Sequence, residues 1–274
     1  MLEEVLYPLA VGVVIVGNVF AYIFCQIVKD NSWIDVFWSL TFVTPLIAIL
    51  IYLGATGQPI YARVILNFVL VSIWAARLSL HIGLRHTKED FRYQDMRASW
   101  MKYGKAAYYV IAFWFIFMMQ GVFSVIVNAA SLYTTIQTDN NNLIWSDYVG
   151  AIVWLAGFVI EVVGDAQLNY HIKDKTPGKQ KFINWGLWRY TRHPNYFGEA
   201  LLWWGIYIIT CSVSWGWATF IAPLFIHILV RFISGVPLLE KKYAGREDWE
   251  AYCKETNCFV PWFVRKTKKA ADSA

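Results

Sequence analysis

Charged side chains are scarce in this sequence. Asp, Glu, Lys and Arg make up 16% of its 274 residues, against about 25% in an average soluble domain. Hydrophobic residues reach 58%, with a mean hydropathy of +0.41. Long apolar runs dominate instead, and a membrane-spanning helix needs a run of about 20 such residues. The composition argues against a water-soluble domain and predicts an all-α, polytopic membrane protein.

Cysteine is also scarce, and its four positions suggest no disulfide framework. Cys253 and Cys258 are five residues apart and have no second Cys or His pair nearby, which argues against a zinc site. No metal ligands are therefore predicted. The regular alternation of basic and aromatic residues that stacks nucleic-acid bases is absent as well. The net charge of +5 therefore does not predict nucleic-acid binding.

Seven apolar segments are predicted to span the membrane. Three connecting loops, residues 54–62, 133–144 and 212–214, contain no Lys or Arg, whereas the segments after the odd-numbered spans hold nearly all 24 basic residues. Basic residues mark the inner side, so the N-terminus is predicted outside and the C-terminus on the positive, cytosol- or matrix-like side. The predicted spans are roughly Val5–Val28, Trp33–Leu53, Arg63–Leu84, Ala106–Leu132, Trp145–Leu168, Tyr196–Cys211 and Trp215–Ser234.

Five ionisable residues fall inside or at the ends of these spans, where charges are costly and by default either paired or functional. Glu161 could pair with Arg77 or Arg231, or it could belong to a ligand site near the inner face; both readings stay open. The five residues are Asp35, Arg77, Glu161, Asp165 and Arg231.

Three glycines recur every seven residues in the fifth predicted span, at Gly150, Gly157 and Gly164. Seven residues are nearly two helical turns, so the glycines share one face. Small residues let a neighbouring helix approach closely. Glu161 and Asp165 lie on the same stripe. We therefore expect both carboxylates to point into the helix bundle.

The stretch TRHPNYFGE, residues 191–199, places polar residues directly before an apolar run. Pro194 cannot continue a preceding helix, and Asn195 is a favoured N-cap. The sixth span is therefore expected to begin at about Tyr196, with its N–H groups beside the charge of Arg192. Such a helix terminus favours an anion. The alternative is a basic loop that touches lipid phosphates.

Four motifs together resemble the steroid 5-alpha-reductase superfamily, and most closely an uncharacterised membrane subfamily of it. They are GLWRYTRHPNYFGE at 186–199, EDFRY at 89–93, MMQG at 118–121 and SGVPLLEKKY at 234–243. The resemblance runs from about Asp35 to Pro261. It implies a multi-helix membrane bundle that binds NADPH in an inside-facing cavity. The chain is then a single membrane domain, 1–274, with substrate-side helices at 1–134 and a reductase-like cofactor half at 145–264.

The resemblance also implies site residues. Steroid reductases hold the enone oxygen of their substrate with a glutamate and a tyrosine that do not align here; by position Asp35 is expected to be the acid, with Tyr93 or Gln120 as partners. In the cofactor half, Asn195 is expected to contact the cofactor and Arg231 its phosphate, with Arg192, Arg189 and Lys173 as phosphate neighbours. Arg92, in EDFRY, is a further candidate for a phosphate ligand. The full cofactor-binding set is Asn195, Tyr196, Glu199, Arg231, Asp165, Glu161, Arg192, Arg189, Lys173 and Arg92.

The expected function is NADPH-dependent reduction of a conjugated C=C bond in a steroid-like or other lipid. One alternative is a membrane methyltransferase that uses S-adenosylmethionine, because isoprenylcysteine-type methyltransferases share the RHPNY core. These enzymes carry paired glutamates after the last span, whereas here Glu240 is followed by Lys241. The other alternative is a non-catalytic subunit or lipid-binding part of a larger membrane complex.

The expected partners are membrane lipids, a lipid-like substrate and other membrane subunits. The topology fits the endoplasmic reticulum, the mitochondrial inner membrane or a bacterial inner membrane.

Overall fold

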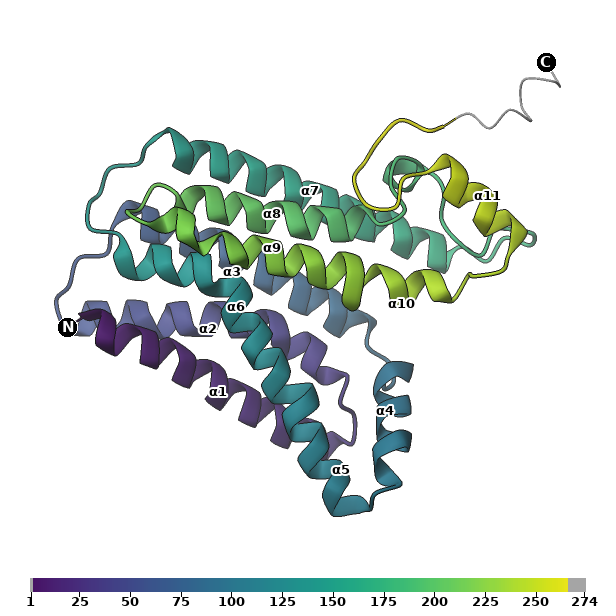
Figure 1. Ribbon diagram of the computed structural model, residues 1–274, viewed down its shortest axis with the longest axis horizontal. Helices are drawn as coiled ribbons and strands as arrows, with labels where there is room; N and C mark the ends of the chain where they lie inside the picture. Colours follow the sequence, from purple (N-terminus) through teal and green to yellow (C-terminus); the bar gives the residue numbers. More distant parts are fainter. Residues whose placement is uncertain (1, 266–274) are drawn as a thin grey trace. The chain divides into compact units, whose positions relative to one another are not determined.

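A computed structural model describes residues 2–265, and throughout that range the regular secondary structure is helical (Figure 1). The all-α prediction is therefore confirmed. The contacts divide the chain into two compact units. Unit 1 comprises the chain up to Tyr148 together with Tyr207–Ala222, and unit 2 comprises Val149–Ile206 and the chain from Pro223 onward. The predicted division into substrate-side helices at 1–134 and a cofactor half at 145–264 stays a prediction. Three of the basic residues used to predict the orientation, Lys266, Lys268 and Lys269, lie outside the described range.

Unit 1 is built mainly from long apolar helices that pack along one another. Polar side chains join α3 to α6, where Asn67 Nδ2 donates to Ser131 Oγ at 2.9 Å and to Thr135 Oγ1 at 3.0 Å. Hydrogen bonds of this kind hold helices together in an apolar surrounding. The helices are α1 (Leu2–Val28), α2 (Trp33–Ala55), α3 (Ala62–Arg85), α4 (Phe91–Met101), α5 (Lys105–Ala112), the π-helical η1 (Phe113–Met118), α6 (Met119–Gln137) and the 3₁₀-helical η3 (Gly216–Phe220).

Unit 2 contains two long helices and a last span that is broken into short pieces. The break includes a π-helical segment, η4, which holds Arg231. The helices are α7 (Trp145–Lys173), the 3₁₀-helical η2 (Gly186–Arg189), α8 (Pro194–Thr210), α9 (Ile221–Ile228), η4 (Leu229–Ile233), α10 (Val236–Lys241) and α11 (Glu247–Glu255). The first residues of α7, the end of α8 and the start of α9 belong to unit 1.

Six helical stretches in the described residues are long and apolar enough to cross a membrane. They correspond to six of the seven predicted spans. The remaining one, α8, has 17 residues, or roughly 25 Å at 1.5 Å per residue, which is shorter than the roughly 30 Å of a bilayer core. The predicted count of seven is therefore not established, and the predicted orientation stays a prediction.

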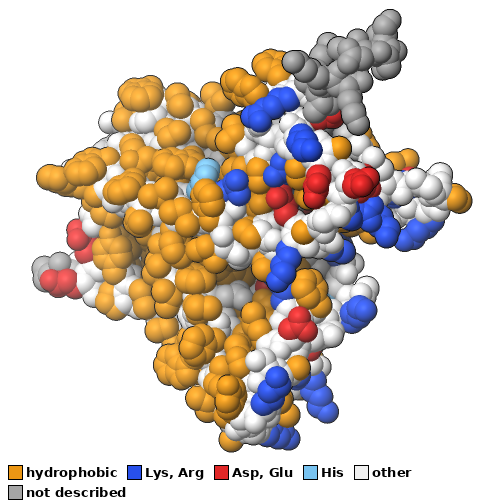
Figure 2. All heavy atoms as spheres, turned by 45° about the vertical axis from the view of Figure 1, so that its right-hand side comes forward, with side chains coloured by type: hydrophobic (Ala, Val, Ile, Leu, Met, Phe, Trp, Pro, Cys, Tyr) orange, Lys and Arg blue, Asp and Glu red, His pale blue; other side chains and the backbone are white. Residues whose placement is uncertain are grey.

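Large apolar side chains on these helices face outward, which suits a lipid surrounding. Val16 is 69% exposed and Ile51 is 66% exposed. Figure 2 shows hydrophobic side chains over most of the left-hand and central part of the face in view, while most charged side chains lie along its right-hand side, from top to bottom.

The predicted close packing at the glycine stripe of α7 is confirmed within unit 2. A Cβ atom at Gly157 would lie 2.7 Å from the carbonyl oxygen of Gly198, and one at Gly198 would lie 2.5 Å from the backbone nitrogen of Glu161. Glu161 and Asp165 are both buried, as predicted. Glycine on both helices therefore brings the backbones of α7 and α8 into direct contact.

Gly198→Val is expected to destabilise unit 2 by about 3 kcal/mol, the upper part of the range for an overpacked core, because the added side chain meets backbone atoms that cannot rotate away. The thermal unfolding midpoint in detergent measures this. Gly12→Val on α1 is the control, since a Cβ atom there meets no atom within 4 Å. Equal midpoints for the two variants would contradict the close packing.

Candidate functional site

The predicted catalytic residues lie together in unit 1. We call Asp35, Arg92, Tyr93 and Gln120 the Asp35 cluster. Asp35 stands in the first turn of α2, and Gln120 lies in α6. The other two residues stand in the first turn of α4, which Asp90 caps by accepting a hydrogen bond from the Arg92 backbone N–H at 2.9 Å.

Hydrogen bonds run through the whole Asp35 cluster. The Tyr93 hydroxyl donates to Asp35 Oδ1 at 2.5 Å, and Arg92 Nη2 donates to Asp35 Oδ2 at 2.9 Å. Gln120 Nε2 donates to the Tyr93 oxygen at 3.3 Å. The structure thus brings Asp35, Tyr93 and Gln120 together as predicted. Arg92, predicted as a phosphate ligand, contacts the carboxylate of this cluster.

Burial makes the Tyr93 phenol a weaker acid. Its side chain is buried, and burial followed by the nearby Asp35 raises the pKa of the phenol well above its usual value. An ordinary phenol already keeps its proton at neutral pH, and this environment makes loss of the proton harder still. A protonated hydroxyl held in a fixed position is suited to donate a hydrogen bond or a proton to a developing oxyanion.

The start of α8 differs from the prediction. The helix begins at Pro194, and the backbone N–H of Phe197 already donates to the His193 carbonyl at 3.0 Å. The prediction that Asn195 is the N-cap is wrong, because proline is well suited to the first helical position, where its missing N–H costs nothing.

The side chain of Asn195 is instead directed at Asp165. Its Nδ2 donates to Asp165 Oδ1 at 3.0 Å, while its own Oδ1 is buried and has no hydrogen-bond partner among the described residues. Gly164 permits this approach, since a Cβ atom there would lie 3.1 Å from the Asn195 backbone nitrogen. The structure therefore brings two predicted cofactor residues together and leaves one buried acceptor open.

Other predicted cofactor residues of unit 2 lie on α7, on α8 and in the last span. Glu161 and Glu199 are buried. The Tyr196 ring stacks on the His193 ring with centroids 6.0 Å apart. The Arg231 guanidinium lies 4.8 Å from the centroid of the adjacent Phe232 ring.

Arg192, a predicted phosphate neighbour, is held by protein groups. Its Nε donates to Glu240 Oε1 at 2.8 Å, and its Nη1 donates to the carbonyl oxygens of Cys253 at 3.2 Å and Thr256 at 2.9 Å. These contacts tie the loop before α8 to α10 and α11. In this structure Arg192 therefore organises the motif that contains it.

The other two predicted phosphate neighbours, Arg189 and Lys173, have exposed side chains. Arg189 lines a cavity of about 360 Å³ together with Trp185 and Glu255, and Lys173 is the last residue of α7. The structure thus separates the three predicted phosphate neighbours into three local settings.

Residues 256–265 pair with the loop before α8, a feature that sequence reasoning missed. The Arg192 backbone N–H donates to the Asn257 carbonyl at 2.9 Å, and the Trp262 N–H donates to the Tyr190 carbonyl at 3.0 Å. The Thr191 hydroxyl donates to the Phe259 carbonyl at 2.7 Å. Most of these bonds use backbone groups, which every residue possesses, so the sequence carries no signal for them.

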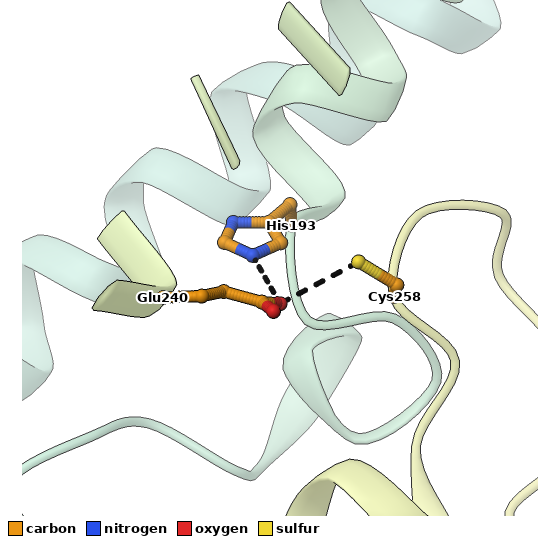
Figure 3. Close-up of side chains that lie close together, drawn as sticks. All are labelled: His193, Glu240 and Cys258. Atoms are coloured by element: carbon orange, nitrogen blue, oxygen red, sulfur yellow. Dashed lines mark hydrogen bonds and ion pairs between the residues drawn. The ribbon is translucent and has the colours of Figure 1, made fainter. Parts of the chain in front are cut away.

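A second missed feature is the cluster of His193, Glu240 and Cys258 (Figure 3). His193 Nε2 lies 3.0 Å and Cys258 Sγ 3.5 Å from the same carboxylate oxygen, Glu240 Oε1. Burial lowers the pKa of His193 and raises the pKa of the Cys258 thiol. In the sequence, Cys253 is the cysteine closest to Cys258. The neighbours of Cys258 in this cluster, Glu240 and His193, lie 18 and 65 residues earlier in the chain.

Long apolar helices with ionisable side chains buried among them define a polytopic integral membrane protein. The chain belongs to the family described as "Protein of unknown function (DUF1295)", which matches residues 21–256. It is 25% identical over 208 residues to the "Uncharacterized protein C594.04c" of Schizosaccharomyces pombe, an alignment that covers 68% of this chain and 59% of that protein's length. No solved structure matches this chain.

Proposed function

We propose that the protein is an NADPH-dependent reductase of a conjugated C=C bond in a steroid-like or other lipid substrate. The observation that carries the proposal is the Tyr93–Asp35 hydrogen bond, in which a buried phenol is held by a carboxylate and flanked by Arg92 and Gln120. The resemblance of the four motifs to steroid 5-alpha-reductases supports it independently.

The reduction needs an acid beside the substrate carbonyl. Addition of hydride to the electron-poor carbon of an enone places negative charge on the carbonyl oxygen, and a fixed donor stabilises that charge. The sequence favoured Asp35 as the acid. Since both Asp35 oxygens accept hydrogen bonds, from Arg92 and Tyr93, we assign the donor to the Tyr93 hydroxyl. Its single hydrogen, which Asp35 Oδ1 accepts in this structure, turns to the carbonyl oxygen when the substrate binds. Gln120, which donates to the phenol oxygen, holds it in both states.

The residues of unit 2 suit a nucleotide cofactor, which supplies the hydride when bound. The buried Asn195 Oδ1 has no hydrogen-bond partner among the described residues, and an unpaired buried acceptor is costly. An amide N–H or a ribose hydroxyl of a nucleotide provides the missing donor. The N-terminus of α8 beside it favours phosphate, and Arg231 adds a cation suited to bidentate phosphate contact.

Asn195→Ala is expected to weaken NADPH binding by about 5- to 100-fold, because loss of the acceptor leaves a buried donor of the cofactor unpaired at a cost of roughly 1–3 kcal/mol. Equilibrium dialysis with the purified protein in phosphate-free detergent buffer measures this. Asn140→Ala, in an exposed loop of unit 1, is the matched control and keeps the wild-type affinity. Binding of S-adenosylmethionine instead of NADPH would overturn the proposal in favour of a methyltransferase.

A further inference from the structure

Three side chains with different metal-binding atoms converge next to the start of α8. His193 comes from the loop before α8, Glu240 from α10 and Cys258 from the segment after α11 (Figure 3). Their ligand atoms all lie within 4.8 Å of one another. Local spacing in the sequence argues against a metal here, whereas the fold joins three distant segments.

The separations fit a tetrahedral metal site. Bonds of about 2.0–2.3 Å from nitrogen, oxygen and sulfur to zinc imply ligand–ligand separations of about 3.3–3.8 Å. The carboxylate oxygen Glu240 Oε1 lies 3.0 Å from His193 Nε2 and 3.5 Å from Cys258 Sγ. The third separation, from His193 Nε2 to Cys258 Sγ, is within 4.8 Å. Shifts of at most about an ångström therefore place a cation between the three atoms.

The crowding around Glu240 Oε1 points in the same direction. Arg192 Nε, His193 Nε2 and Cys258 Sγ all approach this single oxygen, at 2.8, 3.0 and 3.5 Å. A carboxylate oxygen offers about two lone-pair positions, so three N–H or S–H groups compete for two acceptor sites. Binding of a cation removes the competition, because the thiol releases its proton and both sulfur and imidazole bond the metal.

Arg192 and Arg231 both oppose a cation, since the charges of both act on His193 and Cys258. The contacts of Arg192, the nearer of the two to Glu240, limit its effect. Its Nη1 is anchored by the carbonyls of Cys253 and Thr256, and its Nη2 lies 3.3 Å from the second carboxylate oxygen, Glu240 Oε2. The guanidinium thus remains a hydrogen-bond partner of a ligating carboxylate, as outer partners of metal ligands commonly do. We expect its charge to make the affinity weaker than that of four-ligand structural zinc sites.

We propose that His193, Glu240 and Cys258 form a site for a divalent cation of the zinc class, with water as the fourth ligand. Imidazole and thiolate ligands select zinc-like ions over magnesium or calcium. The bound ion ties α10 and the segment 256–265 to the start of α8. This proposal is independent of the proposed reductase activity.

Cobalt(II) titration of the full-length protein in detergent tests the site. The wild type is expected to show a thiolate-to-cobalt charge-transfer band, Cys258→Ser to lose it, and His193→Gln to bind at least tenfold more weakly. Cys253→Ser is the matched control and keeps the band, because Cys253 meets Arg192 through its carbonyl rather than its sulfur. Absence of the band in the wild type, or its persistence in Cys258→Ser, overturns the proposal.

A second measurement does not depend on the folding of any variant. Zinc added to the wild type is expected to slow maleimide alkylation of Cys258, located by mass spectrometry, and to leave the exposed Cys211 unchanged. Equal protection of both thiols indicates an adventitious effect of zinc and overturns the site.

Discussion

Asp147→Ala is expected to destabilise unit 1 by about 3–5 kcal/mol, the cost of leaving one charge of a buried pair without its partner. Arg63 and Asp147 are 2% and 0% exposed, and two hydrogen bonds join them: Nε to Oδ1 at 2.7 Å and Nη2 to Oδ2 at 2.9 Å. Asp147 Oδ2 also accepts from the Ile144 backbone N–H at 2.8 Å. The shift of the thermal unfolding midpoint in detergent measures the loss.

Removing both charges distinguishes a buried ion pair from a packing effect. The double variant Arg63→Met with Asp147→Leu is expected to be more stable than either single variant, because no isolated charge is left in the interior. Asp139→Ala, in the exposed part of the loop before α7, is the control with little effect. If the stability lost in the double variant equals the sum of the losses in the two single variants, Arg63 and Asp147 are not coupled.

Tyr93→Phe is expected to lower NADPH-dependent turnover of an enone lipid by about 10²- to 10⁴-fold, the usual contribution of a general acid. The change removes only the hydroxyl that contacts Asp35 and Gln120. NADPH affinity is expected to stay unchanged, because Asn195 and Arg231, the residues proposed to bind the cofactor, belong to unit 2. Oxidation of NADPH in the presence of an enone-containing lipid extract, followed with purified protein, measures the turnover.

Tyr103→Phe is the matched control. Tyr103 lies just after the end of α4, the helix that carries Tyr93, and its side chain is 74% exposed. Its turnover should equal that of the wild type. Wild-type protein that binds NADPH but reduces no enone lipid would favour the non-catalytic subunit, whereas a Tyr93→Phe variant with full activity would move the acid elsewhere.

The membrane helices were predictable because each rests on a local property of the chain. Apolar runs gave α1 to α3 and α7 nearly as the structure has them. The seven-residue spacing of glycines on α7 predicted close approach of a neighbouring helix, and the structure identifies that helix as α8. The start of α8 was misjudged, because Pro194 suits the first helical position and Asn195 suits the N-cap. Only the contact of the Asn195 side chain with Asp165 shows that Asn195 lies inside the helix and does not cap it.

The candidate site was only partly predictable. Asp35 was selected by its position in the second predicted span, whereas Tyr93 and Gln120 lie in the EDFRY and MMQG motifs. The structure places all three in one hydrogen-bonded cluster. Arg192 looked like a phosphate ligand because its charge is visible in the sequence. Its partner Glu240 lies 48 residues later, and no local pattern in the sequence shows that the two pair. Contacts between distant segments depend on the fold as a whole, and a single sequence does not encode them in any local pattern.

The discontinuity of unit 1 has a consequence for the order in which the chain is made. The Thr210 hydroxyl donates to the Ala130 carbonyl at 3.0 Å and accepts from Thr134 at 2.8 Å, yet residues 149–206 are synthesised in between. At about 5–20 residues per second, that interval lasts roughly 3–12 s. During this time α6 has been synthesised, but Thr210, which bonds it in the finished structure, has not. Insertion of the first helices and completion of their packing are therefore separate steps in biosynthesis.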